Sequence, residues 1–471
     1  MSIREIKNAV FPNNKYEIWE QVALKTIKSH SLETLYSETY EGIKLSPIYT
    51  KKGVKNRLED SYSRGLYIKN NRRIAQKLYC TNWDDLTRQM VKAKECGQET
   101  VSFDVDNLHD TAKLDFGELS NIFNLRTTPL LLFTKYNFQL IARKLLQIDA
   151  DHVIGALAVD LISSQLKRGY LYKLEGQTWA DWKEMICKLD AKYPSLRTIV
   201  IDSTPYHNSG ANAIQELAAS LSEAIHYIEE MQKLGWEPHR TMKKMIFHFS
   251  IGNHFFMEIA KLRAFRLLWK TVCSAYEIDP VECNPLISAE TSTFTKSLLE
   301  PYNNILRSGN EAFAAVAGGV NFLHVAPFNI SDPSDEFAMR IARNTQLLLR
   351  EESYLDKVVD PAGGSFYVET LTGELVEKAW ELFQTIDKKA GIYSVLQSGW
   401  FQSIVKGTLS KRIEDIETRK KSMIGVNVFK QDSNVASLHI SKSDDNHEMD
   451  SVKIEPLEQV RLAEKSESGD F

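Results

Sequence analysis

Short runs rich in β-branched and aromatic residues alternate with helix-length stretches from about residue 72 to residue 370. This alternation implies parallel strands joined by helical crossovers, and eight such units predict an α/β fold of the (β/α)8 TIM-barrel type. The runs are "TVSFDVD" (100–106), "TPLLLFT" (128–134), "HVIGALAVD" (152–160), "LRTIVID" (196–202), "KMIFHFS" (244–250), "NPLISAET" (284–291), "VNFLHVAPF" (320–328) and "KVVDPAGGSF" (357–366).

Three further segments flank the predicted barrel of residues 72–370. Residues 1–71 are predicted to form an N-terminal arm, with one helix in "YEIWEQVALKTIKS" followed by a segment rich in turn residues. Residues 371–428 show apolar positions at helical spacing and predict a helical extension. Residues 429–471 are polar with few aromatic residues, which predicts a linker or tail and not a domain.

Composition excludes several classes of function. The 471 residues are 43% hydrophobic and 25% charged with a formal net charge of -4, which gives no reason to expect nucleic acid or an acidic membrane as a partner. No run approaches ~18 apolar residues, so no membrane span is expected. The five cysteines form no C-x-x-C pair, which favours reduced thiols and a cytoplasmic location. No H-x-x-x-H or H-E-x-x-H is present, so no metal site is predicted.

Candidate reactive residues stand at the predicted carboxyl ends of strands, where TIM barrels carry their chemistry. Tyr206 and His207 follow "LRTIVID", and a histidine there can exchange a proton or hold a carbonyl group. The alternative is that His207 caps the helix that begins near Asn208. His248 and His324 are interpreted as hydrogen-bonded barrel histidines.

Two other strand-end features remain open. Glu290 and Thr291 end the run at 284–291 and are candidates by position alone. The "DPAGGS" segment at 360–365 either cradles a phosphate with its backbone N–H groups or forms only a turn.

Several long blocks resemble the methylmalonyl-CoA mutases and related adenosylcobalamin-dependent acyl-CoA mutases. They are "YSETYEGIKLSPIYT" (36–50), "MEIAKLRAFRLLW" (257–269), "FAMRIARNTQLLLREES" (337–353) and "VVDPAGGSFYVE" (358–369). The resemblance implies a barrel that encloses an acyl-CoA along its axis, and a separate flavodoxin-like domain that holds cobalamin through a D-x-H-x-x-G histidine. We expect that domain to be absent, because Asp445-Asn446-His447 lacks the glycine.

The resemblance also aligns the catalytic positions of the family. Tyr206 and His207 match its Tyr-His pair, and Arg168 aligns with an arginine that holds the substrate carboxylate. Other positions depart from the pattern. Lys77 stands where a tyrosine is expected, Ala158 and Asn321 replace glutamines, and Leu286-Ile287-Ser288 replaces an Arg-Thr-His that meets the CoA.

These departures favour a chain without its own substrate. Losing Arg-Thr-His at 286–288 removes charges that would pair with a CoA phosphate. The runs "PLLLFT" and "MIFHFS" place large side chains on both strand faces, which predicts a filled barrel interior. The chain is therefore most similar to the small, non-catalytic subunit of heterodimeric mutases, and Tyr206, His207 and Arg168 are interpreted as remnants.

That resemblance implies a heterodimer with a large catalytic subunit. The partner would bind adenosylcobalamin and the acyl-CoA, this chain would bind neither, and the arm of residues 1–71 would contact the partner. Two alternatives remain open. The chain is the substrate-binding catalytic half of a split mutase with a separate cobalamin subunit, or it is a free-standing barrel protein that stabilises the mutase.

Overall fold

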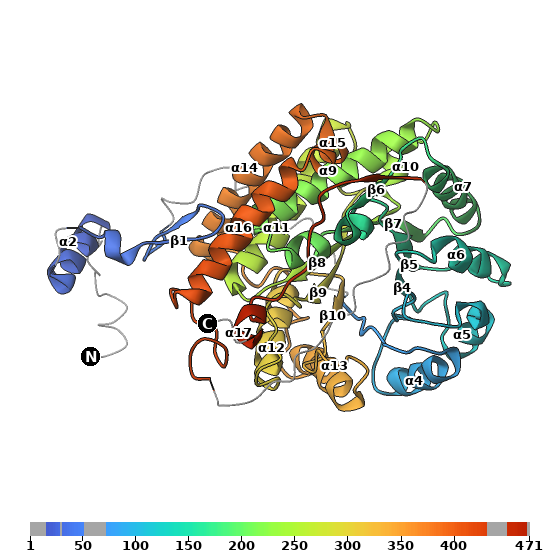
Figure 1. Cartoon of the computed structure of the whole chain (residues 1–471), viewed down its shortest axis with the longest axis horizontal. Coiled ribbons are helices and arrows are strands. Elements are labelled where there is room, and N and C mark those ends of the chain that lie inside the picture. The colour runs from blue at the N-terminus through green and yellow to red at the C-terminus, as the bar shows by residue number, and fades with distance from the viewer. Residues whose placement is uncertain (1–15, 29–30, 51–71, 431–449, 469–471) are drawn as a thin grey trace, which may run out of the picture.

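A parallel, curled β-sheet lies at the centre of the chain. The computed structural model describes residues 16–28, 31–50, 72–430 and 450–468. Seven strands follow the order β3-β10-β9-β8-β7-β5-β4 (Figure 1). Their bounds are β3 (Arg73–Ile74), β4 (Leu130–Phe133), β5 (Gly155–Val159), β7 (Leu196–Asp202), β8 (Met245–Ile251), β9 (Leu286–Thr291) and β10 (Phe322–His324).

The two edges of this sheet are joined by the segment around residues 101–103. Val101 pairs in parallel with Leu130 of β4, and Phe103 pairs in parallel with Leu78, four residues after β3. The segment therefore takes the place of an eighth strand and completes the ring. The predicted TIM-like barrel is confirmed.

Helices surround the barrel because the outward-facing strand residues are large and apolar. Phe247 and Phe249 of β8 pack on Phe265, with ring centroids 4.5 and 5.0 Å apart. Helix α4 (Trp83–Glu95) follows β3, and α5 (Phe116–Ile122) follows the bridging segment at 101–103. The helices that follow the later strands are α6 (Phe138–Gln147), α7 (Gln177–Lys192), α9 (Ala213–Gln232), α11 (Phe255–Ala275), α12 (Asn303–Ala317) and α13 (Glu336–Glu351). Shorter elements are η4 (Thr111–Lys113), η5 (Ser163–Arg168), β6 (Tyr170–Tyr172), α8 (Thr204–Asn208) and α10 (Pro238–Met242).

The prediction of a strand at residues 357–366 is wrong. Residues 360–364 form a turn, and helix α14 (Phe366–Lys388) begins directly after it. The buried guanidinium of Arg263 holds this turn, at 3.1 Å from Asp360 Oδ1 and 2.8 Å from Glu369 Oε1. The first strand is instead the short β3, whose two residues give too weak a pattern to detect in the sequence.

Three helices follow the barrel: α14, α15 (Gly391–Gln397) and α16 (Trp400–Glu417). The next described segment, residues 450–468, differs from the predicted polar tail. Strand β11 (Ser451–Lys453) pairs antiparallel with β6, and Ile454, Leu457 and Ala463 are buried. Short helix α17 (Glu464–Ser468) ends it. Backbone pairing with β6 holds this segment, and composition does not reveal such pairing. Asp445, Asn446 and His447 lie outside the described residues.

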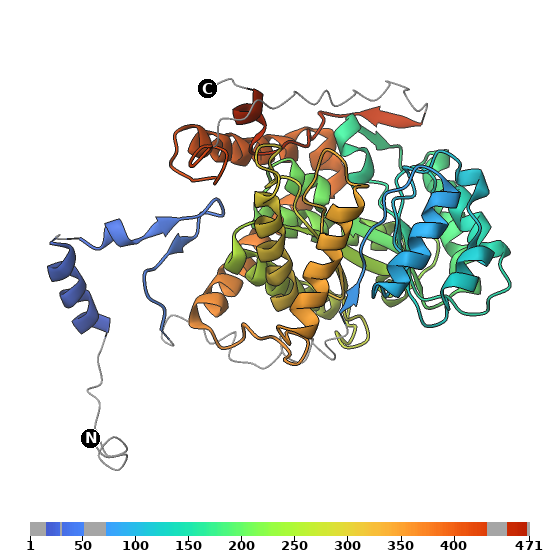
Figure 2. The ribbon, with the colours of Figure 1, turned by 90° about the horizontal axis from the view of Figure 1, so that it is seen from below.

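The described part of the N-terminal arm extends away from the barrel, as Figure 2 shows. Helix α2 (Tyr16–Ile27) has no buried residue. After η1 (Glu33–Leu35), the hairpin of β1 (Ser37–Glu38) and β2 (Lys44–Leu45) returns towards the body, where the Tyr40 hydroxyl donates to Asp415 at 2.8 Å. Among the described helices, none is long and apolar enough to cross a membrane.

Candidate functional site

A cavity of about 540 Å³ opens at the carboxyl ends of the barrel strands. Beneath it the barrel interior is filled by a layer of mainly aliphatic side chains. This layer consists of Ala75, Leu131, Ala156, Ala158, Val200, Ile246 and Phe322. The predicted filled interior therefore holds for the lower part of the barrel and is wrong for its mouth. The mouth residues are largely polar, and their side chains pair with each other instead of packing as a layer.

A cluster of ionisable side chains lines this cavity. The cluster comprises Lys77, Asp202, His248, Glu290 and His324. We call it the mouth cluster. Lys77 Nζ lies 3.4 Å from Glu290 Oε2, and His248 Nε2 lies 3.5 Å from the same oxygen. The side chains of Lys77 and Glu290 are 29% and 14% exposed, so water reaches this pair only in part.

Mutual attraction keeps Lys77 and Glu290 ionised. Burial alone would raise the pKa of Glu290, but Lys77 and His248 hold that pKa well below its usual range. Burial likewise opposes the charge of Lys77, yet Glu290 raises the pKa of the amine above its ordinary value. At neutral pH the amine is therefore not a free nucleophile and the carboxylate is not a proton donor.

The two histidines of the mouth cluster are held by protein partners. His324 Nδ1 accepts the Lys77 backbone N–H at 3.1 Å, and its Nε2 lies 3.1 Å from the Tyr79 hydroxyl. Burial and the charge of Lys77 lower the pKa of His324 to about 3, so it is neutral. His248 Nδ1 lies 3.0 Å from Ser288 Oγ.

The mouth cluster does not fit a cobalt-ligating role. A metal-binding imidazole needs one free ring nitrogen, and both nitrogens of His248 and His324 face protein groups. Across the described ranges, no group of three or more His, Cys, Asp or Glu residues is arranged to hold a metal ion.

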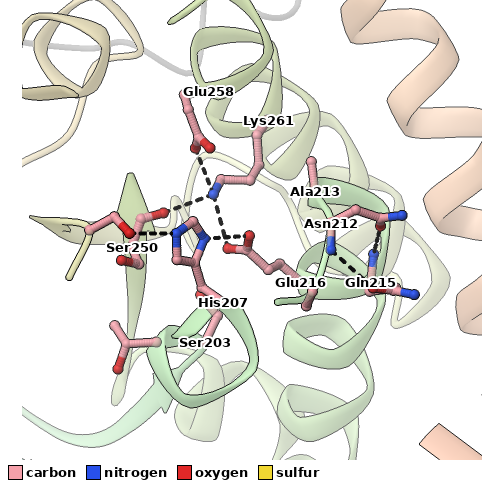
Figure 3. A network of polar contacts seen from close by, with 12 residues as sticks. Ser203, His207, Asn212, Ala213, Gln215, Glu216, Ser250, Glu258 and Lys261 are labelled. Atoms are coloured by element: carbon pink, nitrogen blue, oxygen red, sulfur yellow. Dashed lines mark hydrogen bonds and ion pairs between the residues drawn. The ribbon is translucent and has the colours of Figure 1, made fainter. Parts of the chain in front are cut away.

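The Tyr-His pair lies behind the cavity wall and does not line it. His207 sits in α8, and its Nδ1 is 2.8 Å from Glu216 Oε1 while its Nε2 is 2.9 Å from Ser292 Oγ. Lys261 Nζ reaches Glu216 Oε2 at 2.9 Å and Glu258 Oε2 at 2.7 Å (Figure 3). We call this set of residues the sealed cluster, since each of these side chains is buried.

Tyr206 is equally enclosed. Its ring is fully buried, its hydroxyl donates to Glu223, and its ring packs edge-on against Phe401 with centroids 5.5 Å apart. Burial and the neighbouring carboxylate raise the pKa of Tyr206 well above its usual value. Neither member of the pair contacts the mouth cavity.

Two other predicted site residues do reach the cavity. Arg168, the last residue of η5, lies at its rim with its guanidinium carbon 4.2 Å from the centroid of the Tyr136 ring. Ser288 lines the cavity and bonds His248.

The remaining predicted positions lie elsewhere. Ala158 is in the filled layer, and Leu286, at the start of β9, packs against that layer. Asn321 precedes β10, and its side-chain oxygen accepts the Ile287 N–H at 2.9 Å. This hydrogen bond links the start of β10 to β9. The sequence-predicted site is thus divided between the cavity, the core and the sealed cluster.

Sequence reasoning missed two features of the cavity. The ion pair of Lys77 with Glu290 joins residues 213 positions apart, and only closure of the barrel brings them together. Gln459 also lines the cavity, because residues 450–468 cross the mouth and Val460 donates its backbone N–H to the Asn208 carbonyl at 2.9 Å. Glu290 is a candidate in the sequence because it ends a predicted strand, whereas no sequence pattern marks Gln459 as a cavity residue.

Comparison with known proteins gives consistent matches. The family model described as Methylmalonyl-CoA mutase matches residues 89–469. The methylmalonyl-CoA mutase small subunit of Porphyromonas gingivalis is 32% identical over 68% of this chain and 52% of its own length. The small subunit of Streptomyces virginiae is 34% identical over 59% of this chain and 45% of its own length.

A third relative is matched along most of this chain. The methylmalonyl-CoA mutase of Escherichia coli is 28% identical over 94% of this chain and 68% of its own length. The chain spans about half the length of the two small subunits. With the barrel, the helical extension and the family model in agreement, the chain belongs to the methylmalonyl-CoA mutase family.

Proposed function

We propose that this chain is the supporting small subunit of a heterodimeric methylmalonyl-CoA mutase. The observation that carries the proposal is the position of Tyr206 and His207 in closed protein contacts, away from the cavity. A pair that cannot touch a bound molecule cannot exchange a proton with it. The relatives from Porphyromonas gingivalis and Streptomyces virginiae, both named small subunits, support the same role.

The family's enzymes are adenosylcobalamin-dependent isomerases. In the proposed complex, the large subunit binds cobalamin and acyl-CoA and interconverts methylmalonyl-CoA and succinyl-CoA. In the cytoplasm, this chain stabilises that subunit through contacts made by its barrel and its N-terminal arm. The ion pair of Lys77 with Glu290 supports this assignment, because a charged, already paired lysine stands in the cavity where the family resemblance expects a tyrosine.

A second candidate is the substrate-binding half of a split mutase. The cavity of about 540 Å³ with Arg168 at its rim favours this candidate, since a guanidinium pairs well with a carboxylate. Lys77, Ala158 and Leu286 weigh against it, because they replace residues that the family resemblance assigns to the substrate site.

Co-expression separates the two candidates. We would purify the chain with the large subunit of its organism, and separately with a lone cobalamin subunit, and measure co-elution and acyl-CoA isomerisation. The supporting role predicts a stable complex with the large subunit and activity that is insensitive to Arg168→Ala. Isomerisation by this chain plus a lone cobalamin subunit, abolished by Arg168→Ala, would establish the split mutase instead.

A further inference from the structure

A wholly buried carboxyl group, that of Glu223 on helix α9, lies behind the wall of the mouth cavity. Glu223 is 0% exposed. The Tyr206 hydroxyl donates to its Oε1, whereas its Oε2 has no hydrogen-bond partner among the residues that the structure describes. Within those same residues, no lysine, arginine or histidine forms an ion pair with Glu223. A carboxylate in such a place is disfavoured, because burial penalises the charged form.

A second buried glutamate of α9 shows what ionisation requires at this depth. The side chain of Glu230 is 3% exposed, and both Lys183 and Lys233 pair with it, Lys183 at 2.7 Å. Burial alone would raise the pKa of Glu230, but these two lysines lower it. Burial and the carboxylate of Asp160 instead raise the pKa of Glu223 well above its usual value. Of these two glutamates, Glu230 alone has the cations that an ionised carboxylate needs.

Asp160 is the carboxylate that faces Glu223, and its own contacts favour the ionised form. Its Oδ1 accepts the backbone N–H groups of residues 162 and 163, at 2.9 and 3.1 Å, and the Tyr227 hydroxyl at 2.8 Å. Its Oδ2 accepts the Asp202 N–H at 3.0 Å and has a lone pair left for one more donor. Burial raises the pKa of Asp160, while these donors oppose the rise. Asp160 is therefore the better acceptor of the two carboxyl groups, and Glu223 is the better proton carrier.

Four other titratable groups lie around this part of α9. Asp202, at the end of β7, adds further negative charge near Glu223. Lys261 of α11 approaches the same helix two turns earlier, where it is bound within the sealed cluster. Burial and neighbouring carboxylates raise the pKa of Tyr206 and of Tyr227 well above their usual values, so both hydroxyls keep their protons. None of these four groups supplies a cation for Glu223.

We propose that Glu223 carries a proton at neutral pH and donates it in a hydrogen bond to Asp160, so that a pH-sensitive acid pair supports the wall of the mouth cavity. Asp160 lines this cavity, and the N–H groups that it accepts lie where η5 begins. Loss of the Glu223 proton at alkaline pH would leave two buried carboxylates facing each other, and they repel. We then expect η5, which ends at Arg168, to loosen. This inference does not depend on the proposed function.

Infrared spectroscopy of the full chain in deuterated buffer tests for the proton, because a protonated carboxyl group has a carbonyl band that a carboxylate lacks. We expect the wild type at neutral pH to show such a band, and Glu223→Gln to lose it. Glu230→Gln is the matched control and should keep the band, since it changes a buried glutamate of the same helix that is already ionised. If Glu223→Gln folds and leaves the band unchanged, the proton lies elsewhere and the proposal is overturned. A wild-type spectrum without any such band overturns it with no variant needed.

Hydrogen exchange tests the link between the acid pair and the cavity wall. The amides of η5 (Ser163–Arg168) would be compared in the wild type and Glu223→Gln, at neutral pH and at about pH 9. Because glutamine keeps the uncharged shape of the protonated acid, the wild-type amides should exchange several-fold faster than those of the variant at the alkaline pH alone. Comparison at one pH cancels the intrinsic pH dependence of exchange. Equal exchange of η5 in both proteins at both pH values would show that the acid pair does not hold the wall.

Discussion

The mouth cluster and the sealed cluster are built from the same residue types, yet they lie in opposite environments. Each contains one lysine, at least one glutamate and at least one histidine. In the mouth cluster, Lys77 and Glu290 face a cavity and are partly exposed. In the sealed cluster, Lys261 and Glu216 are 0% and 2% exposed, and His207 completes their hydrogen bonds.

This contrast shows that the position of a polar residue decides its role more than its type does. Charges in the sealed cluster pair with each other in a closed network, so removing one partner leaves a buried charge uncompensated and lowers stability. Charges in the mouth cluster meet water and any molecule that enters, so changes there affect the cavity more than the fold. The family motif of Tyr206 and His207 falls in the stabilising cluster.

The largest expected effect comes from Lys261→Met. Burial opposes the charges of the sealed cluster, but Lys261 lowers the pKa of Glu216 and keeps the network ionised. Removing the lysine leaves Glu216 and Glu258 close together without their cation, and we expect a loss of about 3–5 kcal/mol in the free energy of unfolding. Urea denaturation measures it. A loss below about 1 kcal/mol would show that the cluster is not sealed.

The next effect depends on pH and concerns His324. Its pKa is about 3 in the folded chain, because of burial and Lys77, against an ordinary histidine value of 6.5. Between these values the unfolded chain binds a proton that the folded chain does not, so stability falls as pH falls below about 6.5. The contribution lost at pH 5 is about 2 kcal/mol, and His324→Gln should remove it.

Denaturation of both proteins at pH 7.5 and pH 5 measures this difference. The two pH dependences should diverge only below about pH 6.5, so the pair of values at pH 7.5 is the control. Parallel losses of stability in the wild type and His324→Gln would contradict a neutral, buried His324.

Lys77→Met should have a smaller effect than the same change at Lys261. Glu290 loses its lysine partner but keeps His248 and some access to water, so we expect a loss of about 1–2 kcal/mol. The pKa of Glu290 should rise towards its ordinary value, which an NMR titration of the side chain detects. Equal losses for Lys77→Met and Lys261→Met would remove the distinction between the two clusters.

Arg168→Ala should have the smallest effect. Arg168 stands at the rim of the cavity and stacks on the exposed Tyr136 ring, a contact of the kind that contributes about 0.5–1 kcal/mol at most. We expect the melting temperature to change by only a few degrees. A loss as large as that of Lys261→Met would mean that the rim belongs to the core of the fold.

Much of the fold follows from patterns that are local in the chain. The strands near residues 130, 156, 200, 248, 288 and 323 were predicted from their apolar runs, because each is bounded by turns and followed by a helical period. The run at 357–366 was misjudged, since Asp360 and its glycines form a turn that Arg263 stabilises from a distant helix. Residues 450–468 were misjudged because backbone pairing with β6 leaves no trace in composition.

The candidate site was less predictable than the fold. Glu290, His248 and His324 were named for their strand-end positions alone, and the structure places all three at one cavity. It failed for His207, since α8 turns this residue away from the barrel axis and towards Glu216.

The sequence by itself determined the strand–helix order and, through its long blocks, the membership of the chain in the mutase family. Only the tertiary structure decided which polar residues face the cavity, that Lys77 meets Glu290, and that Tyr206 and His207 are enclosed. The physical reason is that side-chain direction at a strand end depends on the register and on the following turn. Both are settled only when distant strands pair and the helices pack around them.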